Sequence, residues 1–137
     1  MLYKLSFTTS HRYETNQPGI NVPLILQSGS TTVELDAKID TGSSYCIFER
    51  LYGDRLGLDI ESGTPQRIST VTGSFLTYAH EVTLSVLGIE GTAVVYFAHD
   101  ENFTRNVLGR QGWLERVRLG LIDYDSRLYL SDYNDAA

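Results

Sequence analysis

Short runs of β-branched and aromatic residues recur along this chain, and Gly, Asn and Asp separate them roughly every ten residues. The runs favour extended backbone, whereas the separating residues favour turns. The clearest run spans residues 32–39, where Val33, Leu35, Ala37 and Ile39 alternate with polar residues. A period of two directs one row of side chains to a core and the other to solvent. The pattern therefore predicts a mainly β chain.

The other runs predict further strands and two short helices. We expect strands over residues 3–8 and 22–26, a hairpin over 68–78 with Thr72-Gly73-Ser74 at its tip, a hairpin over 81–98 and a closing hairpin over 119–130. Helical spacing of Phe48, Leu51, Tyr52 and Leu56 predicts a helix within residues 47–58 that ends at Gly57. The same spacing of Trp113, Leu114 and Val117 predicts a second helix within residues 110–117.

Composition indicates one ordinary folded domain over residues 1–137. Apolar residues make up 42% of the chain and charged residues 20%, which argues against disorder. The net charge of -6, without a Lys/Arg cluster, disfavours nucleic acid as a partner. The chain has neither a signal-like start nor an apolar stretch of about 20 residues, so we expect a cytoplasmic protein without a membrane partner.

Several residues with reactive side chains are interpreted as structural. Cys46 lies between Tyr45 and Ile47, which favours a small buried thiol over a nucleophile. His11, His80 and His99 lack metal-ligand spacing, and Asp123-Tyr124-Asp125-Ser126 suits a hairpin turn better than a calcium loop. We therefore expect no metal and no cofactor.

Three segments follow one another in an informative order. They are Asp40-Thr41-Gly42-Ser43-Ser44, the hairpin over residues 68–78, and Val107-Leu108-Gly109-Arg110 followed by Trp113-Leu114. In this order they resemble the loop, flap and closing segment of retropepsin-like proteases, the single-domain dimeric aspartic proteases of retroviruses and their cellular and bacterial relatives. Taken alone, Asp-Thr-Gly also suits a turn in which Asp accepts backbone hydrogen bonds. The resemblance covers most of residues 22–130 and implies a small, partly closed β-barrel with one or two short helices.

The resemblance also implies a reaction and an oligomeric state. Two adjacent carboxyls that share one proton can activate water and protonate the leaving nitrogen of an amide. The chain holds one copy of the triplet, so the second carboxyl would come from a second copy of the chain. By resemblance Asp40 is the general base and acid, the Thr41 hydroxyl locks the two loops, and Gly42 permits close approach. The implied substrate is a polypeptide, bound as an extended strand.

Further residues are expected to contact this substrate. They are Ser43 and Ser44 in the loop, Val71, Thr72, Gly73, Ser74 and Tyr78 in the hairpin, and Leu108 before Gly109.

Two residues depart from the viral pattern. Lys38 shares a strand face with Asp40, so it either makes the adjoining pocket polar or, if the strand twists, points into solvent. Ser44 replaces an acidic residue that pairs with arginine in viral enzymes, so Arg110 needs a different partner.

Other functions and contacts stay open. The fold could serve as an inactive peptide-binding or dimerisation module, or the chain could be an unrelated β-barrel with Asp40 in a turn. Residues 3–7 and 128–130 are the two candidate segments for contact between subunits.

Overall fold

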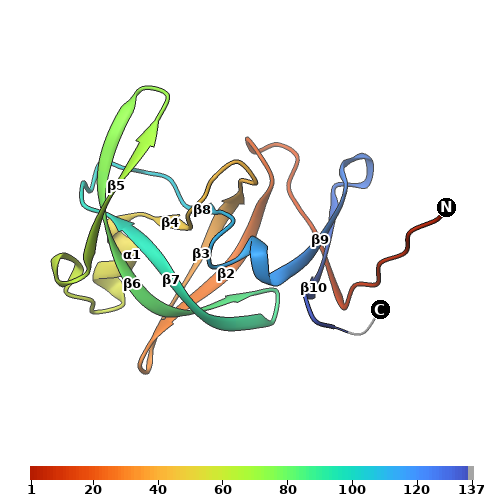
Figure 1. Ribbon diagram of the computed structural model, residues 1–137, viewed down its shortest axis with the longest axis horizontal. Coiled ribbons are helices and arrows are strands. Elements are labelled where there is room, and N and C mark those ends of the chain that lie inside the picture. The colour runs from red at the N-terminus through yellow and green to blue at the C-terminus, as the bar shows by residue number, and fades with distance from the viewer. Residues whose placement is uncertain (136–137) are drawn as a thin grey trace.

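The computed structural model describes residues 1–135 and is built mainly from strands (Figure 1). The larger sheet contains β2 (Asn21–Ser28), β3 (Thr31–Ile39), β4 (Ile47–Phe48), β5 (Thr64–Thr70), β6 (Gly73–Val86), β7 (Ile89–Ala98) and β8 (Val107–Leu108). Its order is β2-β3-β8-β4-β7-β6-β5, and β2 also pairs with β6. This extra pairing closes every strand except β5 into a ring. The predicted mainly β, partly closed barrel is confirmed.

A second sheet joins the two ends of the described chain. It contains β1 (Thr9–Arg12), β9 (Val117–Ile122) and β10 (Arg127–Asp132) in the order β1-β10-β9. The expected strand over residues 3–8 is wrong, because pairing with β10 begins near Thr8 and the side chains of Tyr3 and Leu5 are exposed. The predicted closing hairpin corresponds to β9 and β10. Its residues 128–130 are paired on both sides within the chain.

Side chains from both sheets share one core. Leu24 and Leu26 of β2, Phe97 of β7, and Leu128 and Leu130 of β10 are all buried in it. The alternation predicted for β3 is also present, since Leu35 and Ala37 are buried while their polar neighbours are exposed. The hydrophobic contribution to stability therefore comes from the inner faces of the strands.

The first predicted helix is present but shorter. Residues 47–48 form β4, and the helix α1 spans Arg50–Arg55. Leu56 is buried as expected, whereas Leu51 is exposed. Gly53 is buried instead, against Ile60 and Phe97. An added Cβ would lie 2.9 Å from Ile60 Cδ1 and 3.1 Å from the ring of Phe97, so the packing leaves no room for a side chain here. The chain leaves the helix through Gly57, whose φ is +78°.

The second predicted helix is wrong. Within residues 110–117 the structure has a single 3₁₀ turn, η2 (Leu114–Arg116). Gly112 precedes it with φ at +95°, which helical backbone does not allow. Trp113 is nevertheless buried, so the apolar side chains predicted for the inner face reach the core from irregular backbone. No helix within residues 1–135 is long and apolar enough to cross a membrane.

Both predicted long hairpins are present, joined by one continuous strand. β5 and β6 pair around a tip at Val71 and Thr72, so Gly73 and Ser74 already belong to β6. β6 then continues to Val86 and pairs with β7. The β5–β6 hairpin stands away from the ring, at the end opposite the sheet of β1, β9 and β10, here called the terminal sheet (Figure 1).

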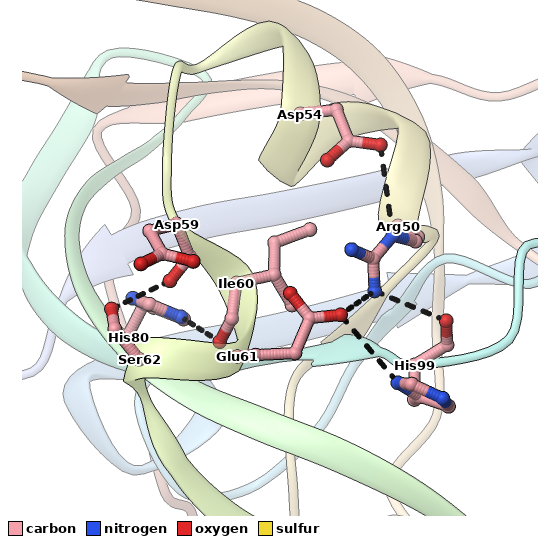
Figure 2. Close-up of polar contacts among 8 residues, drawn as sticks. All are labelled: Arg50, Asp54, Asp59, Ile60, Glu61, Ser62, His80 and His99. Carbon is pink, nitrogen blue, oxygen red and sulfur yellow. Dashed lines mark hydrogen bonds and ion pairs between the residues drawn. The ribbon is translucent and has the colours of Figure 1, made fainter.

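The base of the β5–β6 hairpin is anchored by a polar cluster (Figure 2). The guanidinium of Arg50 in α1 lies 2.7 Å from Glu61 Oε1 and donates to the carbonyl of His99 at 3.2 Å. Glu61 belongs to the 3₁₀ turn η1 (Ile60–Ser62), which leads into β5. The hydrogen bond from Arg50 lowers the pKa of Glu61, and the Arg50 charge adds to the effect. The cluster thus fastens the hairpin to α1 and to the end of β7.

Candidate active site

The loop that follows β3 holds Asp40 in a fixed orientation. The backbone N–H of Asp40 donates to the carbonyl of Leu108 at 3.0 Å, and that of Ser43 donates to the carbonyl of Asp40 at 3.1 Å. Asp40 Oδ1 accepts the N–H of Gly42 at 2.9 Å. Because the side chain remains exposed, this carboxylate is oriented by its own loop and open to a reactant.

The segment after β8 is hydrogen-bonded to this loop and supports it. β8 lies between β3 and β4, parallel to β3 and antiparallel to β4. Beyond it, the N–H groups of Arg110 and Gln111 donate to the carbonyls of Ser43 and Ser44 at 2.9 and 3.0 Å. A Cβ on Gly109 would lie 2.2 Å from the carbonyl oxygen of Tyr45, so this close backbone approach requires glycine.

Cys46 lies beneath the loop as a structural residue. Its Sγ accepts the N–H of Gly109 at 3.4 Å and donates to the carbonyl of Gln111 at 3.4 Å. Burial raises the pKa of the thiol to about 11, an effect only partly offset by the Gly109 hydrogen bond. The predicted buried thiol is confirmed, and its protonated form is a poor nucleophile at neutral pH.

The three hydroxyls of the loop have different environments. Ser43 Oγ donates to the carbonyl of Tyr45 at 2.8 Å and is half-buried, so it stabilises the turn. Thr41 and Ser44 are exposed. Within residues 1–135 neither hydroxyl has a hydrogen-bond partner in this chain. Both are therefore accessible from outside it.

A pocket of about 340 Å³ adjoins Asp40. It is lined by Asn21, Asp36, Lys38, Asp40, Thr104, Arg105, Asn106 and Val107. Lys38 thus shares a pocket with Asp40, although its side chain is exposed. The Lys38 stem packs over Gly19, where an added Cβ would come within 2.6 Å of Lys38 Cε. Lys38 is thus both part of the pocket lining and exposed to solvent.

A second pocket of about 560 Å³ lies between the tip of the β5–β6 hairpin and the loop before β8. Its lining includes the tip residues Val71, Thr72, Gly73 and Ser74. The rings of Phe75 and Phe103, which also line it, stack on each other with centroids 4.6 Å apart. Thr104 and Arg105 line both pockets, so the hairpin tip and Asp40 border one continuous surface.

Two of the expected contact residues lie elsewhere. Leu108 is 1% exposed, so its contribution to the site is the carbonyl that fixes Asp40. Tyr78 sits at the base of the hairpin, where its ring packs edge-on against His99 at 5.8 Å, and it lines neither pocket. Conversely, Arg105 was not among the expected residues, because only the pairing of β3 with β8 brings it beside Lys38.

Arg110 supports the loop through its backbone. Its side chain is exposed and lines a further pocket of about 460 Å³ with Ser44, Gln111, Leu114 and Glu115. In the described part of the chain its guanidinium makes no ion pair, in accord with the replacement of an acidic residue by Ser44. No group of three or more His, Cys, Asp or Glu side chains within residues 1–135 is arranged to hold a metal ion.

Comparison with known proteins agrees with this geometry. The family model described as aspartyl protease matches residues 19–121. Among solved structures, the EIAV protease complexed with the inhibitor HBY-793 has a similar fold, with a TM-score of 0.54 and 18% sequence identity. The similarity covers 71% of this chain and 86% of the viral one. A search of curated proteins found no match.

Proposed function

This chain belongs to the aspartyl protease family, and we propose that it is an endopeptidase that works as a homodimer. The observation that carries the proposal is the Asp40 carboxylate, fixed by the Gly42 N–H yet exposed beside a continuous surface that reaches the hairpin tip. The loop provides one such carboxylate per chain. Acid–base hydrolysis of an amide by carboxyls needs two, and a two-fold axis beside Asp40 would supply the second.

The proposed reaction uses the two Asp40 carboxyls as one unit. Like charges held a few ångströms apart do not both ionise easily, so the pair shares one proton. The ionised carboxyl removes a proton from a water molecule, whose oxygen attacks the carbonyl carbon of the peptide. The protonated carboxyl donates its proton to the carbonyl oxygen. When the tetrahedral intermediate collapses, a proton passes to the amide nitrogen and the C–N bond breaks.

Two exposed groups, one in the Asp40 loop and one in the segment bonded to it, favour a partner at this surface. The Thr41 hydroxyl and the Arg110 guanidinium have no hydrogen-bond or ion-pair partner among residues 1–135 of their own chain. A second subunit placed on a two-fold axis would offer the same loop in return. The β5–β6 hairpin would then cover an extended polypeptide from above, with its backbone groups as hydrogen-bond partners.

The test combines loss of activity with subunit mixing. Asp40→Asn should abolish cleavage of a mixed peptide library, whereas Asp125→Asn, at an exposed turn far along the chain, should leave it unchanged. Retained cleavage by Asp40→Asn would exclude the mechanism. Binding of peptides by the wild type without cleavage between about pH 3 and pH 8 would instead favour an inactive peptide-binding module.

Mixing tests whether the two carboxyls come from different subunits. If subunits exchange freely, an equal amount of Asp40→Asn added to wild type converts half of the wild-type chains into mixed dimers. Activity should then fall to about half. A monomeric enzyme would keep its full activity in the same mixture.

A further inference from the structure

We propose that the pocket beside Asp40 selects substrates with an acidic side chain, Asp or Glu, next to the bond that is cut. This inference rests on the proposed function and names a substrate class for it. Its basis is the pair of cations, Lys38 and Arg105, which line the pocket together with Asp40.

Neither cation is neutralised within the chain. Among the residues described, neither Lys38 nor Arg105 has a carboxylate within the 4.0 Å that defines an ion pair. Both side chains are exposed. The two residues are far apart in sequence and come together because β3 runs parallel to β8, with Lys38 opposite Val107. The same lining holds two carboxylates, Asp36 and Asp40, and because the Asp40 pair shares one proton in the proposed reaction, the cations outnumber the ionised carboxylates.

Both cations are carried by well-anchored backbone. The Lys38 N–H donates to the carbonyl of Asn106 at 2.9 Å, and the Lys38 stem lies over Gly19. On the other side, the Asn106 amide donates to Glu49 Oε2 at 2.6 Å and its oxygen accepts the Glu49 N–H at 3.0 Å. Arg105 directly precedes this fixed residue. A fixed backbone loses less conformational freedom when a ligand binds, which favours binding at this position.

The charges in the pocket discriminate among side chains. A carboxylate could accept hydrogen bonds from both Lys38 and Arg105, and a guanidinium can hold it through two parallel bonds. An apolar side chain would displace water from both cations without offering them a hydrogen bond in its place, which costs free energy. A basic side chain would face these two like charges, against the attraction of Asp36 and of an Asp40 pair that shares one proton in the proposed reaction. The pocket therefore favours Asp or Glu over neutral and basic residues.

The test measures binding without requiring cleavage. Four labelled pools of peptides, random in neutral residues, carry Glu, Gln, Leu or Lys at one fixed central position. Each pool is titrated into Asp40→Asn protein, and fluorescence anisotropy gives the apparent affinity. We expect the Glu pool to bind about five- to tenfold more tightly than the Gln pool at low salt, and less so at high salt.

Matched variants identify the source of the preference. Lys38→Gln and Arg105→Gln, each combined with Asp40→Asn, should remove most of it, whereas Lys4→Gln and Arg127→Gln on exposed positions should keep it. Equal binding of the Glu and Gln pools, tighter binding of the Lys pool, or a preference that survives loss of both pocket cations would overturn the inference. Cleavage by the wild type is scored separately. A Glu preference without any cleavage would refute the proposed reaction and leave the acidic subsite standing.

Discussion

Replacement of Gly109 by alanine should disrupt the support of the loop at Asp40 while the rest of the fold stays in place. An added Cβ would lie 2.2 Å from the carbonyl oxygen of Tyr45 and 2.7 Å from that of Ser43. Non-bonded carbon and oxygen atoms do not approach much closer than about 3 Å, so the loop or the segment after β8 must move by roughly 1 Å. Both contacts are with backbone, which cannot rotate away.

The movement would lengthen or break the two hydrogen bonds that join Arg110 and Gln111 to the loop. Each contributes about 1 kcal/mol, and a stranded buried group costs about 1–3 kcal/mol, so we expect a loss of about 2–4 kcal/mol in the free energy of unfolding. Since a 1 Å misplacement of a reacting group can cost about a hundredfold in rate, activity should fall by about that factor even under conditions where the protein stays folded.

Urea unfolding, followed by the fluorescence of the single tryptophan, Trp113, measures the change in the free energy of unfolding. Gly91→Ala in β7 is the matched control, because the nearest atom to its added Cβ is a flexible arginine nitrogen at 3.8 Å. Gly109→Ala with a stability within about 0.5 kcal/mol of wild type would refute the reasoning. Equal destabilisation by Gly91→Ala would refute it as well.

Two further predictions concern protonation. Arg50 lowers the pKa of Glu61 in the folded state. The contribution of ionised Glu61 to the free energy of unfolding is therefore complete above its ordinary pKa of 4.5 and is lost as the pH falls through the lowered pKa. In Glu61→Gln the resistance to urea should therefore fall less steeply with decreasing pH than in wild type. Glu14→Gln, the control, should keep the wild-type dependence, and an unchanged dependence for Glu61→Gln would contradict the prediction. Burial of Cys46, with its pKa raised to about 11, should protect the folded protein from iodoacetamide at about pH 8, while urea-unfolded protein reacts. Rapid labelling of folded protein would show that the thiol is accessible.

Elements with a strong local pattern could be predicted from the sequence. The alternation of apolar residues over 32–39 predicts β3, and Gly88 between two apolar runs predicts the β6–β7 hairpin. The loop at Asp40 was placed correctly at the end of β3. In these cases local backbone preference and burial favour the same conformation.

Elements that depend on distant partners could not be predicted in this way. β8 has two residues and becomes a strand only because β3 and β4 flank it. Lys38 and Arg105 line one pocket because of that same pairing, so sequence periodicity gives no sign that they belong together. Gly53 has a poor intrinsic helix propensity, yet the packing of Ile60 and Phe97 leaves no room for a larger residue.

The terminal sheet has a consequence for the order in which this chain can fold. β1 pairs with β10 and with no other strand in residues 1–135, and the Thr8 N–H bonds Ser131 Oγ across 123 positions of sequence. β1 therefore acquires its partner only after the long stretch of chain between β1 and β10 has been synthesised. Closing so long a loop is slow compared with forming the local β6–β7 hairpin. During synthesis the ring of strands in the larger sheet can assemble first, whereas β1 remains unpaired until β10 is available.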